Sequence, residues 1–123
     1  MSDFRKLQVW QKAHALMLRI HSATDSLRAS RFAALKGQMN RAAESVPANI
    51  VESRGHDSRK ESKRFLRIAL NSTTELEYHL IAARDLRAIS ARQCEELTEA
   101  LIEVRKMLYG LIKYLRAQSP PYT

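Results

Sequence analysis

Apolar residues recur every three or four positions in four separate stretches of the chain, which is the spacing of one face of an α-helix. The first stretch spans Phe4 to Thr24, and the second spans Arg31 to Ser53. Their apolar positions are Phe4, Leu7, Trp10, Ala13, Met17 and Ile20, then Leu35, Met39, Ala42, Val46 and Ile50. The first half of the chain is therefore predicted to form two helices.

The second half adds two stretches, and each begins with a helix start signal. Ser58 with Glu61, and Ser90 with Gln93, have the spacing of a capping box, in which two side chains satisfy free amides of the first turn. The third helix is predicted to end near Arg87. The apolar positions after the two caps are Phe65, Ala69, Leu76, Leu80 and Ala83, then the heptad seam Leu97, Leu101, Val104, Leu108, Leu111 and Leu115.

Short connections between these helices favour antiparallel neighbours, so the expected fold is all-α, an up-down-up-down four-helix bundle. The 123 residues are expected to form one domain at 1–117, followed by a flexible tail at 118–123. No uncharged run reaches the ~20 residues of a membrane span, and the first residues lack the apolar segment of a signal peptide. The lone cysteine, Cys94, fits a reducing compartment. A cytoplasmic protein without a membrane partner is therefore expected.

The segment ESVPANIVESRGHD, residues 44–57, places Pro47 inside the second predicted helix. Proline in a helix interior costs about 3 kcal/mol, because it removes a backbone hydrogen bond and clashes with the preceding turn. Either the helix bends at Pro47, or it ends there and another helix begins. Apolar spacing continues from Val46 to Ile50, which favours a bend within one helix.

Polar residues near this segment are interpreted as contacts that hold the second and third helices in register. Antiparallel pairing across the loop at residues 54–57 brings Arg41 near residues 71–75, which read NSTTE. An ion pair between Arg41 and Glu75 would explain why both are tolerated between packed helices. The predicted structural network consists of Arg41, Asn49, Glu52, Ser72 and Glu75.

The formal net charge of +8 comes from the first half, because residues 1–67 hold 14 Lys and Arg against 6 Asp and Glu, whereas residues 68–123 hold 7 of each kind. The candidate nucleic-acid-binding residues are Arg54, Arg59, Lys60, Lys63, Arg64 and Arg67. Such a cluster favours a polyanion or an acidic protein surface. Phe65 is expected to point into the core, so contacts to the phosphate backbone are expected rather than base stacking. The alternative is a solvated face with local partners at Glu52 and Glu61.

Apolar residues beside the predicted core stripes could serve self-association, because a monomeric bundle needs one apolar face per helix. These residues are Val9, Leu16 and Leu18 in the first helix, and Ile102, Tyr109 and Ile112 in the fourth. The alternative is a thick core in a small bundle.

No spacing in the sequence indicates catalysis, a cofactor or a metal. His14 and His21 lie seven positions apart, not the four that pair two ligands on a helix, and His56 and His79 lie on other segments. Bundle di-iron sites use Glu-x-x-His pairs, and the sequence has none. The expectation is a protein that is not an enzyme.

The runs QMNRAAESVPANIVES and KRFLRIALNSTTELEYHL resemble a bacterial four-helix-bundle family encoded in intervening sequences of large-subunit ribosomal RNA genes. Accessory variability determinant proteins of diversity-generating retroelements are related to this family. The residues that carry the resemblance are Arg41, Ala42, Ala43, Ser45, Pro47, Asn49, Ile50 and Glu52, then Phe65, Leu66, Ile68, Ala69, Ser72, Glu75 and Leu76. Ser53 and Asn71 stand where the family pattern has glycine.

The resemblance implies a ring-like homo-oligomer, typically a pentamer. For the retroelement members it also implies a basic surface that binds nucleic acid, RNA or DNA, and a reverse transcriptase. Two functional hypotheses follow from the residues and the resemblance together. The first is a homo-oligomeric accessory protein that binds structured RNA or an RNA–protein complex through its basic cluster. The second is a self-assembling, protein-binding scaffold with no direct nucleic-acid role.

Overall fold

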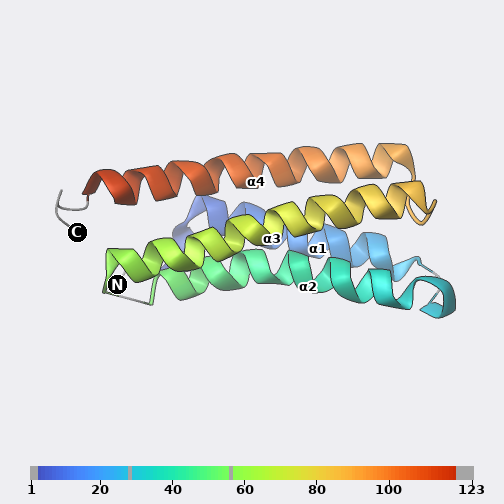
Figure 1. Ribbon diagram of the computed structural model, residues 1–123, viewed down its shortest axis with the longest axis horizontal. Helices are drawn as coiled ribbons and strands as arrows, with labels where there is room; N and C mark the ends of the chain where they lie inside the picture. The colour runs from blue at the N-terminus through green and yellow to red at the C-terminus, as the bar shows by residue number, and fades with distance from the viewer. Residues whose placement is uncertain (1–2, 28, 56, 119–123) are drawn as a thin grey trace.

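The computed structural model describes residues 3–27, 29–55 and 57–118, and within these ranges the chain is helical with no strand. Its elements are a short 3-10 helix η1 (Phe4–Lys6) and the helices α1 (Gln8–Asp25), α2 (Ala29–Ser53), α3 (Arg59–Asp85) and α4 (Ala91–Gln118). The helices run alternately up and down side by side (Figure 1). The predicted four-helix bundle is thus confirmed.

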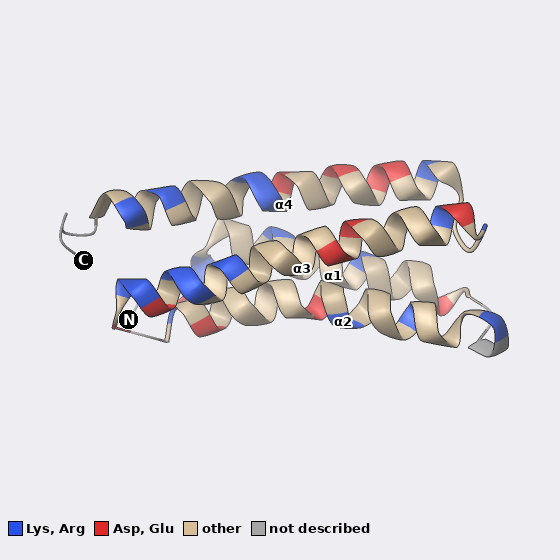
Figure 2. Cartoon of the chain, viewed as in Figure 1, with Lys and Arg blue, Asp and Glu red and all other residues tan. Residues whose placement is uncertain are grey.

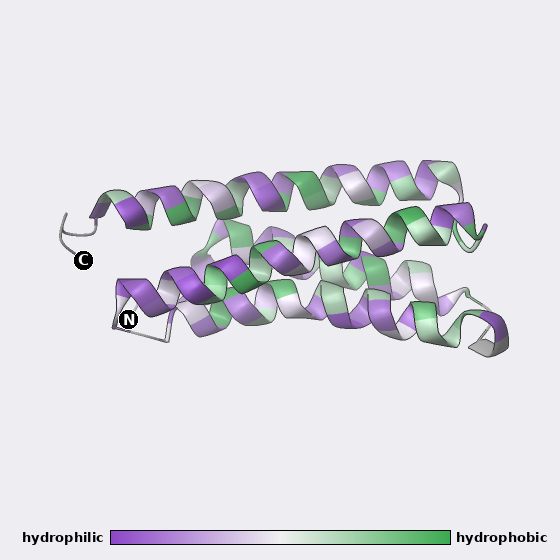
Figure 3. Ribbon diagram, in the orientation of Figure 1, coloured by the Kyte–Doolittle hydropathy of each residue, from purple (hydrophilic) through white to green (hydrophobic). Residues whose placement is uncertain are grey.

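The core lies along the centre of the bundle, where each helix presents its apolar stripe to the others (Figure 3). Ile20, Met39, Leu66, Leu80 and Leu101 are completely buried there. Burying a side chain of this size contributes about 1.5–3 kcal/mol, so the shared stripe explains why four helices associate. None of the described helices is long and apolar enough to cross a membrane.

The helix bounds differ from the sequence-based prediction at several ends. Leu7 has extended dihedrals (φ −73°, ψ 124°), so the first predicted helix is divided into η1 and α1. The second helix begins at Ala29, two residues earlier than predicted. The fourth continues to Gln118, which the sequence had assigned to the tail. The rest of that tail, residues 119–123, lies outside the described residues, as does His56.

The predicted caps of α3 and α4 are present. Ser58 accepts a hydrogen bond from the Glu61 amide at 3.3 Å. The Ser90–Gln93 pair is fully reciprocal, because the Gln93 amide donates to Ser90 Oγ at 3.0 Å and the Ser90 amide donates to Gln93 Oε1 at 3.1 Å. Such caps satisfy amides that the first turn leaves free, and they fix where both helices begin.

Helix α2 continues through Pro47, which is buried, so the prediction of one helix is correct. The non-helical dihedrals within α2 belong to Phe32 (φ −117°, ψ 20°), near its start, where no sequence pattern predicts a kink. A bend at Pro47 itself stays a prediction.

Helix α3 ends at Asp85, two residues before the predicted position. Arg87 adopts left-handed dihedrals, with φ of 61°. Its amide donates to the Arg84 carbonyl at 3.0 Å, and the Ala88 amide donates to the Ala83 carbonyl at 2.8 Å. This is the Schellman arrangement, which usually contains glycine at the left-handed position. Because this position holds arginine instead of glycine, the end of α3 could not be recognised from the sequence.

Candidate nucleic-acid interface

The basic cluster lies on the first turns of α3, starting directly after the Ser58 cap (Figure 2). Lys60 and Arg67 are exposed and Lys63 is half-buried, and none of the three forms an ion pair with a described carboxylate. Spacings of three and four residues put these side chains on one helical face. Three positive charges are therefore available to a ligand.

The other members of the predicted cluster have partners or a different position. Arg64 forms an ion pair with Glu61 at 2.7 Å and lies 4.5 Å from the centre of the Phe65 ring. Arg59 donates to the backbone carbonyl of Gln118 at the end of α4. Arg54 is half-buried at the end of α2. The expected ion pair between the cluster and Glu61 is present, because Glu61 pairs with Arg64. Glu52 forms no ion pair with the described part of the cluster.

The structure adds the C-terminal part of α4 to this surface, because α3 and α4 are antiparallel. Lys106, Lys113 and Arg116 are exposed and form no ion pair with a described residue. The Arg59–Gln118 hydrogen bond ties the end of α4 to the start of α3. Basic side chains from two helices, distant in sequence, therefore share one end of the bundle (Figure 2).

The charges along the sequence indicate that the basic surface extends onto α4. The net charge of residues 68–123 taken together is zero, however, and conceals this pattern. Residues 104–123 hold 4 Lys and Arg and no Asp or Glu, whereas residues 68–103 hold 3 against 7. Farther along α3 and α4, cations have carboxylate partners: Arg84 with Asp85, Arg92 with Glu96, and Arg105 with Glu77. The unpaired positive charge of these two helices is thus confined to one end.

The predicted polar network between α2 and α3 is centred on Ser45, which the sequence analysis did not include. Ser72 donates to Ser45 Oγ at 2.7 Å, and Asn49 Nδ2 donates to the Ser45 hydroxyl at 3.0 Å and to the Ser45 carbonyl at 2.8 Å. Closer to the loop, the Ser62 hydroxyl donates to the Ser53 carbonyl at 2.8 Å. Of the predicted members, Ser72 therefore joins the two helices, and Asn49 contacts its partner Ser45 within α2.

The predicted contact between Arg41 and Glu75 is wrong. Glu75 instead lies 3.4 Å from His79 on its own helix, and the exposed Arg41 side chain lies against Gly37 of its own helix. Glu52 is also exposed. The contacts between Ser45 and Ser72 show that the register is shifted by about one turn from the simple count across the loop. That shift still leaves Arg41 level with Glu75, so the contact is absent because both side chains lie on exposed faces of their helices.

A polar contact between α3 and α4 was missed because its members are far apart in sequence. Arg105 donates through Nε to Thr73 Oγ1 at 3.2 Å and through Nη2 to Glu77 at 2.7 Å. Thr73 is fully buried. The contact therefore fixes α4 against α3 just beyond the basic end.

Half of the apolar residues assigned to a possible self-association surface belong to the core. Val9, Leu16 and Ile112 are buried, and Ile112 takes the place in the seam that the heptad pattern gave to the half-buried Leu111. Leu18 and Tyr109 are exposed at 54% and 60%, and Ile102 is half-buried. The three buried residues thus belong to a thick core, which was the alternative to a self-association surface.

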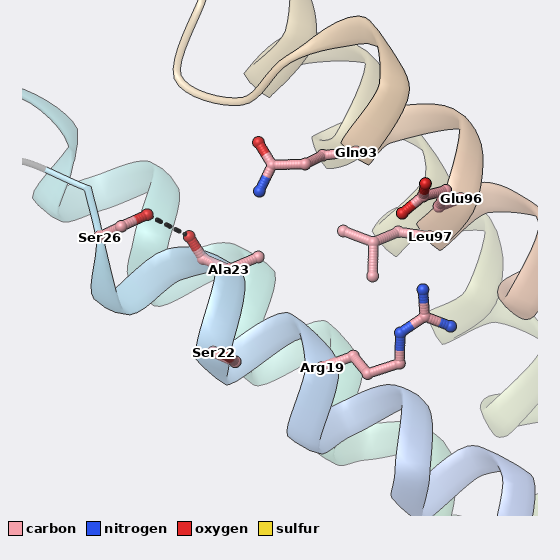
Figure 4. Close-up of a pocket in the computed structure, with 7 residues that line it drawn as sticks. All are labelled: Arg19, Ser22, Ala23, Ser26, Gln93, Glu96 and Leu97. Carbon is pink, nitrogen blue, oxygen red and sulfur yellow. Dashed lines mark hydrogen bonds between the residues drawn. The ribbon is translucent and has the colours of Figure 1, made fainter.

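The pockets do not contain a recognisable reaction centre among the described residues. A pocket of about 270 Å³ between α1 and α4 is lined by Arg19, Ser22, Gln93, Glu96 and neighbouring residues (Figure 4). Ser26, at its rim, donates to the Ala23 carbonyl at 3.0 Å. No group of three His, Cys, Asp or Glu side chains in the described ranges could hold a metal. The expectation that the protein is not an enzyme stays a prediction.

Comparison with known proteins identifies the family of this chain. The sequence model of the 23S rRNA-intervening sequence protein family matches residues 5–110. The chain belongs to this family. A crystal structure of a protein of unknown function from the S23 ribosomal protein family of Bacteroides thetaiotaomicron superposes with a TM-score of 0.76 at 26% identity, covering 85% of this chain and 98% of that one. The comparison with curated proteins gives no match.

Membership in the 23S rRNA-intervening sequence family confirms the resemblance drawn from the α2 and α3 motifs. The serine at one of the two glycine positions of the family pattern is accommodated locally. Ser53 is buried at 3% exposure, and its hydroxyl donates to the Ile50 carbonyl at 2.6 Å. Asn71 is exposed, so its side chain needs no space in the core. The relation to retroelement proteins stays a prediction.

Proposed function

We propose that this protein is a non-enzymatic, homo-oligomeric accessory protein that binds RNA through the basic end of α3 and α4. The observation that supports the proposal is the group of unpaired cations Lys60, Lys63 and Arg67, joined by Lys106, Lys113 and Arg116. Cations that lack carboxylate partners attract phosphates without first breaking an ion pair. The ribosomal RNA context in the family name is consistent with such a ligand.

The test is the affinity for an RNA hairpin, measured by fluorescence anisotropy across a salt series. Each phosphate contact contributes about −0.9 to the slope of log affinity against log salt on a duplex, or about −0.7 on a single strand. The variant Lys60→Gln/Lys63→Gln/Arg67→Gln should therefore bind more weakly, with a slope reduced by about 2 to 3. Its oligomer mass by light scattering should equal that of the wild type.

A charge-matched control is available in Lys12→Gln/Lys36→Gln/Arg92→Gln. These cations already have partners at Glu103, Asp25 and Glu96 on other parts of the bundle. The control removes the same three charges and should leave the salt slope unchanged. Equal losses in both triple variants would mean that only the overall charge matters, and the proposed interface would be rejected.

A second candidate function is a protein-binding scaffold, supported by exposed apolar residues away from the basic end. Ile81 and Leu86 are exposed at 40% and 52%, and Ile81 lines a groove of about 490 Å³ between α3 and α4, together with Ala91 and Cys94. Weak RNA binding with the same salt slope in wild type and both triple variants would favour this function.

A further inference from the structure

Tyr109 is a large aromatic side chain without a partner in the middle of the basic end. It is 60% exposed, and within the described residues it makes no hydrogen bond and no ring contact. Lys106 precedes it by three positions and Lys113 follows by four, so all three side chains share one face of α4. The ring of Tyr109 therefore offers an exposed aromatic face between two positive charges.

The antiparallel register brings this face of α4 beside the cations of α3. Arg105 contacts Thr73, and Arg59 contacts Gln118, so the intervening parts of α4 and α3 run next to each other. Tyr109 lies one turn after Arg105 in α4. Because the two helices are antiparallel, Tyr109 lies beside the part of α3 that is one turn before Thr73. Arg67 and Leu70 occupy that turn, and Lys63 lies one turn farther.

Two other exposed tyrosines lie on these helices: Tyr114, at 59%, is also in the basic end but five positions after Tyr109 and so on another face of α4, whereas Tyr78 has different surroundings. Tyr78 is 64% exposed and directly follows Glu77 on α3, in the acidic part of the α3–α4 surface. Its ring also contacts His79, with a centroid distance of 5.5 Å. An anionic strand would be repelled there, whereas the surroundings of Tyr109 would attract it.

We propose that Tyr109 is a stacking platform for an unpaired RNA base, whose flanking phosphates are held by Arg67, Lys106 and Lys113. Sequence-tolerant binding of single strands combines these two components, a positively charged track for the backbone and an aromatic ring for the base. A paired base in a duplex stem keeps its faces covered by its neighbours, so the platform selects loops, bulges and single-stranded ends. The inference rests on the proposed function and names the class of RNA that the site takes.

The experiment compares a perfectly paired RNA duplex with the same duplex carrying a three-nucleotide uridine bulge. The three added phosphates cancel, because for each RNA the variant is compared with the wild type. Affinities are measured by anisotropy at a fixed salt concentration for wild type, Tyr109→Ala, Tyr109→Phe and Tyr78→Ala. Stacking of one base on an aromatic ring is worth about five- to hundredfold in affinity. Tyr109→Ala should lose at least about fivefold on the bulged RNA and less than twofold on the duplex.

The two controls separate stacking from other causes. Tyr109→Phe keeps the ring and should bind the bulged RNA like the wild type, and Tyr78→Ala removes an equally exposed ring and should have no effect. Equal affinity of wild type and Tyr109→Ala for the bulged RNA would overturn the stacking platform, while leaving the charge-based function intact. A wild type that binds neither RNA would overturn the proposed function together with the platform.

Discussion

Ser45 connects α2 with α3 by accepting hydrogen bonds from Ser72 and Asn49. At this scale a single hydroxyl matters because Ser72 is 7% exposed, so water cannot replace a lost partner. Leaving a buried donor unsatisfied costs about 1–3 kcal/mol. Ser45→Ala should therefore lower the free energy of unfolding by about 1–3 kcal/mol, measured by urea denaturation.

The double variant Ser45→Ala/Ser72→Ala should lose less than the two single variants summed, because removing both partners leaves no unsatisfied donor. Ser22→Ala, at an exposed position of α1, serves as the control and should change stability by less than about 0.5 kcal/mol. A Ser45→Ala protein as stable as the Ser22 variant would show that this cluster does not hold the helices together.

At the scale of elements, the end of α3 contains a strained residue that can be relieved. Arg87 has a φ of 61°, in the left-handed region that favours glycine, and its exposed side chain forms no ion pair with a described residue. The left-handed conformation costs a residue with a Cβ about 1–2 kcal/mol. Glycine avoids this cost but loses more chain entropy on folding, by about 0.5–1 kcal/mol. Arg87→Gly should thus stabilise the protein by up to about 1 kcal/mol, seen as a higher melting temperature.

Arg87→Ala is the matched control for this turn, because it removes the same side chain and keeps the Cβ. Its stability should stay within about 0.5 kcal/mol of the wild type. If both variants were stabilised equally, the gain would come from removing a positive charge, and the left-handed cap would carry no strain.

At the scale of the whole molecule, the α3–α4 surface is divided into a basic end and an acidic part (Figure 2). Along α4, at 1.5 Å per residue, Glu95 and Glu99 lie about 10–17 Å from Lys106, the nearest cation of the basic end, and about 21–27 Å from Lys113. The screening length of salt is about 8 Å at 0.15 M and about 30 Å at 0.01 M. Glu95→Gln/Glu99→Gln should therefore strengthen RNA binding at 0.01 M salt and leave it unchanged at 0.15 M.

The measurement is the affinity of this double variant for the RNA hairpin at both salt concentrations. Equal strengthening at the two concentrations would mean that these carboxylates lie close to the bound RNA. That result would place the interface nearer the middle of α4 than its C-terminal end.

The sequence by itself determined the four helices, the caps of α3 and α4, the antiparallel bundle and the α3 half of the candidate interface. These features depend on neighbours a few residues apart, such as the Ser90–Gln93 box and the apolar spacing of Leu97, Leu101, Val104 and Leu108. Periodicity and capping are local, so a linear reading recovers them.

Only the tertiary structure decided which polar residues meet and which cations share a surface. The face that each helix turns toward its neighbour depends on how side chains interlock: Arg41 and Glu75 lie level with each other but are exposed, whereas Ser45 and Ser72 meet at the α2–α3 contact. The antiparallel course of α4 likewise brought Lys106, Tyr109 and Lys113 beside a cluster more than forty residues earlier in the chain. Packing between distant segments controls both results, because it is set by the shape of the whole core rather than by any local pattern.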